Sequence, residues 1–423
     1  MNTLTLNNPK WIINKREDLQ WLIFSALVGF VIIGIYYLLT GYYVLDKNIC
    51  IGVIYLLWAM LFDATHAFAT YTRTYFDNEY RENNKSLLWQ SLIVFIIGPL
   101  FLISIFSVHT DLNETSAAFI VFNRFGLCFA YYHLIRQHWG FIVLYRKKNG
   151  ETDEITRKLD GLLLMFGSIY PFVHGQFDKI EPMHISETLV IPIEAWLNVS
   201  IYTGIIGGVL LLLSFVNNFY SAKFYLRIIS SINLIASVII NLTRYFTLSL
   251  LLQFVSFLCL IGFVLTIITY LVILFREKST REQLTNNYPK WLLLITVLFS
   301  YNLILHLNLP LYVIIASLTI FHNIQYHKIV NYHNINKYKS GEEERFGFAV
   351  VLTQKIKVFI ALALAFNLIS YIPRVTSNIL ISSELINYIL SSFFWGVAFH
   401  HYYLDSIIWK VKSDVELSSA LKM

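Results

Sequence analysis

The feature that most constrains this chain is a series of apolar runs that recurs along its whole length. A helix needs about 20 apolar residues to cross the hydrocarbon core of a bilayer, and each run has roughly that length. Hydrophobic residues occupy 57% of the 423 positions and charged residues only 14%, whereas a typical soluble domain has about 25% charged residues. The sequence therefore predicts an all-α, polytopic integral membrane protein.

The apolar runs predict about twelve transmembrane helices. Their expected limits are 21–44, 50–72, 88–108, 116–145, 159–177, 197–220, 225–243, 247–275, 290–307, 310–330, 356–374 and 386–410. The runs at 116–145 and 386–410 exceed the length of a simple span, so these two helices are expected to project from the bilayer at one end. Between 225 and 275 the sequence also allows one long tilted helix instead of two spans.

Basic residues alternate with the predicted spans. The connections at 73–87 and 146–158 are rich in lysine and arginine, whereas the loop at 178–194 is acidic. Loops rich in lysine and arginine remain on the cytoplasmic side of a membrane. With about twelve spans, this pattern predicts that both the N-terminus and the C-terminus are cytoplasmic.

The predicted spans form one domain. A cytoplasmic N-terminal segment at 1–20 precedes a transmembrane helical domain at 21–410, and a cytoplasmic tail follows at 411–423. The transmembrane domain contains two halves of six predicted spans, 21–220 and 225–410, which hints at an internal repeat. The first 20 residues lack the apolar core of a cleavable signal peptide, and we expect a bacterial-type inner (plasma) membrane location.

Other sequence features exclude several classes of function. Cys50, Cys128 and Cys259 lie in or beside apolar stretches without CxxC spacing, so we interpret them as packing residues. The net charge of +6 mostly reflects the basic loops and does not indicate binding to nucleic acid. No GxGxxG, P-loop or CxxCH pattern supports a dinucleotide, a nucleotide or covalent haem.

The histidines are distributed unevenly. Seven of the twelve fall on predicted spans two, four, ten and twelve, in the cytoplasmic halves or at the cytoplasmic ends, and two acidic residues lie near them; the set is His66, His133, His138, His322, His327, His400, His401, Asp63 and Asp405. Ionisable residues inside a bilayer are costly and usually functional. We therefore expect these nine residues to form a metal site.

The spacing on a helix decides which of these side chains share a face. Asp63 lies three residues before His66, and Asp405 lies four residues after His401, so each carboxylate shares a helical face with an imidazole. Such a carboxylate is either a metal ligand or the acceptor that fixes the tautomer of a ligating histidine.

Other pairs diverge. Two pairs of histidines are five residues apart and one pair is adjacent, namely His133 with His138, His322 with His327, and His400 with His401. Five residues rotate a helix by about 140° net and one residue by about 100°. The two members of a pair therefore either flank two metal ions, or one ligates while the other packs.

Imidazole nitrogen suits iron, zinc and copper, and adjacent carboxylates favour harder ions. Seven imidazoles and two carboxylates exceed the needs of one ion. We therefore expect iron, with two ions per chain, held with open positions for dioxygen. Zinc, which usually takes four ligands, remains an alternative.

The histidine pairs resemble a known pattern. His133-Leu-Ile-Arg-Gln-His138 and His322-Asn-Ile-Gln-Tyr-His327 look like the HxxxxH boxes of integral-membrane di-iron desaturases and hydroxylases, and Phe399-His400-His401 looks like the end of the HxxHH box of that superfamily. The resemblance is one of ligand type and covers three short patches. It implies dioxygen-dependent C–H chemistry on a lipid-like or other hydrophobic substrate.

Further polar residues are candidates for the same site. Arg124 and Arg136 lie within the fourth predicted span, where an arginine needs a partner or an aqueous cavity. Tyr326 stands beside the histidine candidates and is a candidate proton donor. We take Tyr326 and Arg136 as catalytic candidates.

The remaining histidines are expected to be less informative. His333 is expected to be a solvated loop residue and His306 an interfacial one, and the outer residues His109, His174 and His184 are expected to be loop residues, although a second site among them stays open.

Three functions remain open. The first is a membrane-embedded, metal-dependent oxidoreductase of oxygenase type, which works with membrane lipids or another hydrophobic substrate and with a separate electron-donor protein. The second is a membrane oxidoreductase whose histidines clamp haem. The third is a secondary transporter, because about twelve spans with both ends inside is a common transporter layout.

Overall fold

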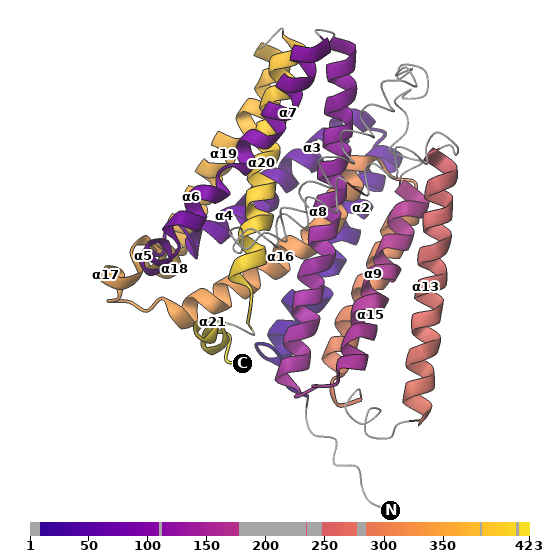
Figure 1. Cartoon of the computed structure of the whole chain (residues 1–423), viewed down its shortest axis with the longest axis vertical. Coiled ribbons are helices and arrows are strands. Elements are labelled where there is room, and N and C mark those ends of the chain that lie inside the picture. Colours follow the sequence, from indigo (N-terminus) through magenta and orange to yellow (C-terminus); the bar gives the residue numbers. More distant parts are fainter. Residues whose placement is uncertain are drawn as a thin grey trace, which may run out of the picture. The chain divides into compact units, whose positions relative to one another are not determined.

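The computed structural model describes residues 9–109, 112–176, 234, 248–276, 285–380, 383–411 and 414–423, and these residues form helices and connecting turns without a strand (Figure 1). The helices are α1 (Lys15–Glu17), η1 (Asp18–Ile23), η2 (Phe24–Ala26), α2 (Leu27–Tyr37), η3 (Leu38–Tyr42), α3 (Lys47–Trp58), η4 (Ala59–Asp63), α4 (Ala64–Thr72), α5 (Asn78–Asn83), α6 (Lys85–Ser91), α7 (Val94–His109), α8 (Leu112–Lys148), α9 (Glu154–Gln176), α13 (Leu248–Arg276), α15 (Tyr288–His306), α16 (Leu311–Lys337), α17 (Glu343–Phe346), α18 (Phe348–Gln354), α19 (Ile356–Leu380), α20 (Glu384–Ile408) and α21 (Val415–Ala420). The prediction of an all-α protein is confirmed.

Several described helices are long and apolar enough to cross a membrane. Six meet this condition alone, and a pair bent by 110° makes a seventh if it is one span; they are Lys15–Tyr42, Lys47–Thr72, Lys85–Ser107, Ala118–Lys148, Leu252–Arg276, Tyr288–His306 and the pair Phe348–Gln354 with Ile356–Ile369. The coarse prediction of a multi-pass helical protein agrees with this number of helices.

The count of twelve is not confirmed. The expected spans 159–177, 310–330 and 386–410 are helical, as α9, α16 and α20, but these helices are not among the apolar candidates. The expected span 197–220 and all of 225–243 except residue 234 lie outside the described residues, as does the boundary between the two expected halves.

Contacts between Cα atoms divide the chain into two units. One unit comprises Met1–Ser168 together with Gly262–Met423, and the other comprises Ile169–Ile261. All seven inner histidines and both carboxylates belong to the first unit.

Helix α16 is the central helix of the first unit. It packs against α2, α3, α4, α8 and α15, and 15 of its 27 residues are buried, among them the polar residues His322, Asn323, Gln325 and Asn334. Because other helices surround it, α16 carries polar side chains inside the protein. For this reason α16 is too polar to meet the composition of a membrane span, although it lies at the centre of the first unit.

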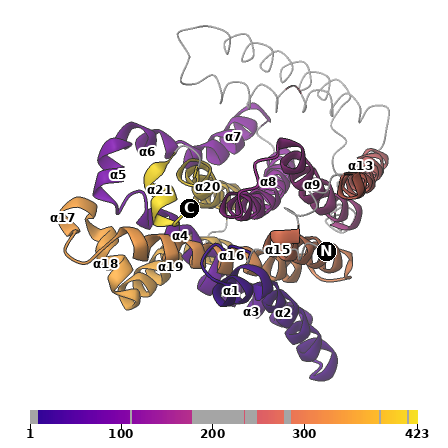
Figure 2. The same cartoon turned by 90° about the horizontal axis from the view of Figure 1, so that it is seen from below.

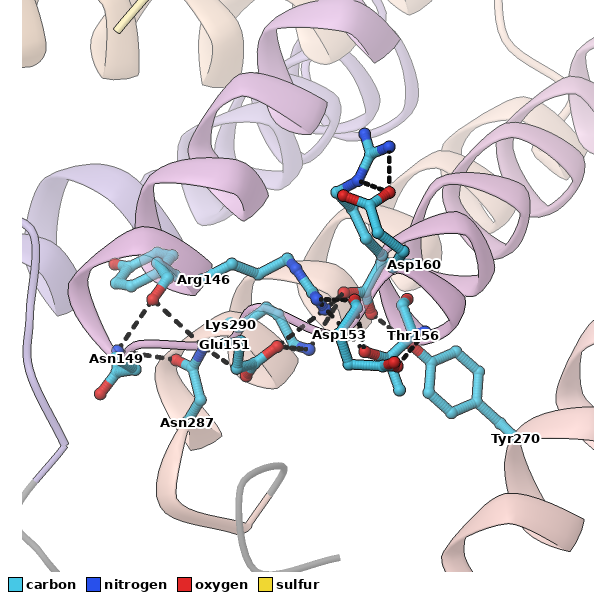
Figure 3. A network of polar contacts seen from close by, with 12 residues as sticks. Arg146, Asn149, Glu151, Asp153, Thr156, Asp160, Tyr270, Asn287 and Lys290 are labelled. Atoms are coloured by element: carbon cyan, nitrogen blue, oxygen red, sulfur yellow. Dashed lines mark hydrogen bonds and ion pairs between the residues drawn. The ribbon is translucent and has the colours of Figure 1, made fainter. Parts of the chain in front are cut away.

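A buried network of four charged side chains connects the ends of α8, α9 and α15 (Figure 3). Arg146 Nη1 lies 2.8 Å from Glu151 Oε2 and 2.6 Å from Asp160 Oδ2. Lys290 Nζ lies 2.9 Å and 3.0 Å from the same two oxygens. All four side chains are at most 3% exposed.

Neutral side chains complete this network. Tyr270 of α13 donates to Asp160 Oδ1, and Asn287 Nδ2 donates to Glu151 Oε1 at 2.7 Å. Two cations therefore face two carboxylates, and both oxygens of each carboxylate have partners. Buried charges persist only when they are paired and hydrogen-bonded in this way.

Removing one charge from this network should destabilise the protein strongly. Lys290→Met leaves two carboxylates with a single cation, and breaking a buried pair in this way costs about 3–5 kcal/mol. We expect a large drop in the melting temperature of the detergent-solubilised protein.

Arg157→Gln is the matched control, because Arg157 pairs with Glu154 at an exposed position, where an ion pair contributes about 0–1 kcal/mol. Equal melting temperatures for Lys290→Met and Arg157→Gln would contradict a structural role of the network.

Candidate metal centre

Four helices of the first unit surround the candidate site. Helix α4 packs against α16, α16 against α8, α8 against α20, and α20 against α4, so the four contacts close a cycle. In the view of Figure 2 the labels α4, α8, α16 and α20 lie next to one another. Each of these helices carries histidines that the sequence singled out.

One histidine from each helix enters the space between them. The imidazole centroids of His66 and His322 are 5.1 Å apart, those of His322 and His133 5.0 Å, those of His133 and His401 5.1 Å, and those of His401 and His66 4.6 Å. Each imidazole therefore contacts two others edge to face, in the same cyclic order as the helices. We call His66, His133, His322 and His401 the four-histidine cluster.

The ring nitrogens at the centre of the cluster lack hydrogen-bond partners. Both nitrogens of His66, Nε2 of His133, Nδ1 of His322 and Nε2 of His401 are buried without a partner. Buried polar atoms in proteins almost always have a partner, and each exception calls for an explanation. The two nitrogens of one imidazole point away from each other, so a cation can bind only one nitrogen of each ring. One partnerless nitrogen from each of the four imidazoles is explained if a cation binds it.

Distances between the nitrogens fit this explanation. One nitrogen each of His66, His322 and His401 lie within 4.8 Å of one another, and the same limit holds for ligand atoms of His133, His401 and Asp405. Metal–nitrogen bonds of about 2.0–2.1 Å place two ligand atoms at most about 4.2 Å apart. Shifts of a few tenths of an ångström in side-chain position would bring these atoms into the coordination sphere of an ion.

Asp405 is the carboxylate of the cluster. Its Oδ2 lies 3.6 Å from His401 Nε2 and 3.9 Å from His133 Nε2. Its Oδ1 accepts hydrogen bonds from Tyr326 Oη at 2.6 Å and from Thr70 Oγ1 at 3.1 Å. One oxygen is thus held by hydroxyl groups, which leaves the other to face the imidazoles.

Tyr326 is buried beside the cluster. The phenol is 1% exposed, and its ring centroid lies 5.7 Å from that of His66 and 5.3 Å from that of His401. The structure therefore brings this catalytic candidate to the predicted site.

Three of the predicted ligands point elsewhere. His138 Nε2 lies 3.1 Å from Tyr301 Oη, and His327 Nε2 lies 3.1 Å from Thr65 Oγ1. His400 contacts Ser91 and two tyrosines. The divergence of about 100–140° expected within each pair explains this result, because only one member of each pair faces the space between the helices.

His400 has hydrogen-bond partners on both nitrogens. Nδ1 lies 3.2 Å from Tyr71 Oη, and Nε2 lies 2.8 Å from Ser91 Oγ and 3.1 Å from Tyr75 Oη. Burial raises the pKa of Tyr75, so its phenol keeps its proton at neutral pH. His400 therefore joins α20 to α4 and α6 as a packing residue.

The remaining candidates lie at the edge of the site or away from it. Asp63 Oδ1 lies 3.8 Å from His66 Nδ1, with 44% of the Asp63 side chain exposed. Arg136 is exposed on α8 rather than buried with the histidines. Arg124 is partly buried on the same helix.

One expectation about the other histidines is wrong. His333 is not a solvated loop residue, because α16 extends to Lys337 and buries His333 to 1% exposure. Its Nδ1 lies 2.9 Å from Asn334 Oδ1. His306 is exposed at the end of α15, as an interfacial residue would be, and His174 is exposed on α9.

The outer histidines remain untested as a group. His184 lies outside the described residues, and the side chain of His109 is not described.

Sequence reasoning missed Thr70. This fully buried threonine lies four residues after His66 on α4, so the two share a helical face. That spacing was the available signal, but threonines are common on such helices. Only the packing of α4 against α16 and α20 shows that its hydroxyl group meets His401, Tyr326 and Asp405.

A cavity of about 70 Å³ lies beside the cluster. Its lining residues are Tyr55, Ala59, Asp63, Ala64, His66, Ala67, Asn367, Phe394, Val397, Ala398, His401 and Tyr402. Part of this wall is η4, a π-helical turn directly before α4, and π-helical turns occur frequently at functional sites. The cavity therefore reaches two members of the cluster, His66 and His401, and most of its lining residues belong to η4, α4 and α20.

The geometry favours a bare ion over haem. An axial pair of histidines must leave a slot for the flat macrocycle between them, but here each imidazole touches two others at centroid distances of 4.6–5.1 Å. Four nitrogen ligands and one carboxylate oxygen suit iron, zinc or copper.

Comparisons with protein-family models, curated proteins and solved structures found no match. The candidate site therefore rests on its own geometry.

Adjacent residues His400 and His401 offer a direct test of the site. We expect His401→Gln to lose bound metal, since a ligand nitrogen is removed from the middle of the cluster. We expect His400→Gln to keep it, because His400 bonds Ser91, Tyr71 and Tyr75 instead. Metal content per chain, measured by mass spectrometry on purified protein of matched folding, distinguishes them; equal loss in both variants would contradict the assignment.

Proposed function

We propose that this protein is a membrane-embedded, metal-dependent oxidoreductase that acts on a hydrophobic substrate. The observation that carries the proposal is the convergence of partnerless, buried imidazole nitrogens from four helices. Such a cluster destabilises the fold unless a cation binds it, which supports a metal-binding role.

Iron is the proposed metal. The four histidines of the cluster and Asp405 would hold the ion, and a mixed set of imidazole and carboxylate ligands suits iron. The sequence favoured two ions, but His138, His327 and His400 have other partners, so we favour one ion at the cluster. Asp63, beside His66, is the residue nearest to a second position.

Each residue has a proposed role. Bound iron would supply the activation of dioxygen. The four histidines and Asp405 orient the ion, and Tyr326 holds Asp405 Oδ1 and keeps a hydroxyl proton close to the cluster. The surrounding helices exclude bulk water, because His66, His322 and His401 are at most 5% exposed.

The substrate class follows from the surroundings. Alanine, valine and aromatic side chains form much of the cavity wall, and the described part of the chain contains six or seven candidate membrane spans. We propose that a lipid or another apolar molecule approaches from the bilayer and that a separate protein supplies electrons. A topology of about twelve spans with cytoplasmic termini in a bacterial-type inner membrane belongs to the same proposal.

Metal analysis of the purified protein tests this function. Expression in iron-replete cells should yield about one iron per chain without the Soret band of haem. Loss of the metal on chelation should lower the melting temperature, because binding to the folded state alone stabilises it. Protein that neither contains nor rebinds iron or another transition metal would refute the proposal.

The cavity should control access to the metal. Ala398→Leu adds three carbon atoms to its wall, so we expect iron content to be unchanged but nitric oxide, an analogue of dioxygen, to bind the reduced iron form several-fold more slowly. Stopped-flow absorbance measures this rate. Ala365→Leu, at an exposed position on α19, is the control. If both variants bind nitric oxide at the same rate, the cavity is not the route by which dioxygen reaches the metal.

A further inference from the structure

The hydroxyl group of Thr70 connects three helices at the cluster. Its Oγ1 lies 2.6 Å from His401 Nδ1, 2.6 Å from Tyr326 Oη and 3.1 Å from Asp405 Oδ1. Thr70 belongs to α4, Tyr326 to α16, and His401 and Asp405 to α20. The side chain is fully buried, so no bulk water competes for these contacts.

Other threonines of this segment use their hydroxyl groups differently. Thr65 Oγ1 donates to Leu61 O at 2.8 Å, Thr72 Oγ1 to Ala69 O at 2.7 Å, and Thr74 Oγ1 to Thr70 O at 3.1 Å. Bonding to a carbonyl of the preceding turn is the usual behaviour of a helical threonine. Thr70 instead contacts side chains of the candidate site.

The number of protons limits how these groups bond. A threonine hydroxyl group has one proton and can accept two hydrogen bonds, and Tyr326 donates its own proton to Asp405 Oδ1. If the Thr70 hydroxyl group donates its hydrogen bond to Asp405 or Tyr326, Thr70 Oγ1 must accept in the 2.6 Å contact with His401. Nδ1 of His401 then carries a proton. If the Thr70 hydroxyl group instead donates its hydrogen bond to Nδ1, neutral His401 carries its proton on Nε2.

Only the first arrangement frees Nε2 of His401. Nε2 is the partnerless nitrogen of His401, and it lies 3.6 Å from Asp405 Oδ2 at the cluster. A ligating histidine donates its other ring N–H to an oxygen, which fixes the tautomer and the orientation of the imidazole.

We propose that Thr70 is a positioning residue whose hydroxyl oxygen accepts a hydrogen bond from the Nδ1–H of His401 and whose hydroxyl proton is donated in a hydrogen bond to the Asp405–Tyr326 pair. It thereby directs the lone pair of His401 Nε2 and the free oxygen of Asp405 toward the same ion. This inference rests on the proposed metal-binding function. One hydroxyl group would thus orient two ligands of α20, His401 and Asp405.

Cobalt(II) binding to the metal-free protein tests this inference, because its visible absorption reports ligand geometry. Thr70→Val keeps the shape of the side chain but removes the hydroxyl group, and loss of such a supporting contact weakens metal binding by about 10–100-fold. We expect weaker binding by that factor and a changed absorption spectrum, with both restored in Thr70→Ser. If Thr70→Val does not fold, Thr70→Ala removes the same group without added bulk.

The control is Thr72→Val, because Thr72 is equally buried on α4 but bonds Ala69 and Asn334. We expect wild-type affinity and spectrum there. If Thr70→Val binds cobalt with an affinity within twofold of the wild type and has the wild-type spectrum, the proposed role of Thr70 is wrong. The metal site itself would remain in place. Absence of cobalt binding in the wild type itself would overturn the proposed function and this inference with it.

Discussion

The burial of polar groups without water is the constraint on which this structure depends. In apolar surroundings a charge or an imidazole nitrogen is stable only when a partner satisfies it. The network around Arg146 and Lys290 meets this requirement within the protein, since two carboxylates face two cations. The four-histidine cluster does not, and its partnerless nitrogens are the basis of the proposed metal site.

The two polar centres therefore have opposite roles. A complete network stabilises one conformation and needs nothing from outside. An incomplete one destabilises the fold unless a ligand binds, so the proposed metal site would couple metal binding to stability. Asp405 has one oxygen of each kind. Tyr326 and Thr70 donate hydrogen bonds to Oδ1, whereas Oδ2 faces His133 and His401.

The sequence predicted the helical class of the fold, which the described residues confirm, and placed the candidate site residues on four helices; its count of about twelve spans is not confirmed. Composition does not separate a lipid-facing helix from one surrounded by other helices, and α16 shows why: its polar residues are buried by its neighbours. The same effect made His333 look like a loop residue, whereas the last turns of α16 bury it.

The sequence by itself determined that the chain is helical and apolar, that histidines occur on four helices, and that the two members of each histidine pair diverge, because helical periodicity follows from local spacing. Only the tertiary structure decided which member faces inward. The contacts of α4, α8, α16 and α20 selected His66, His133, His322 and His401 and brought Thr70 to them. The contact between Thr70 and His401 joins residues 331 positions apart, and local patterns carry no information about such distant packing.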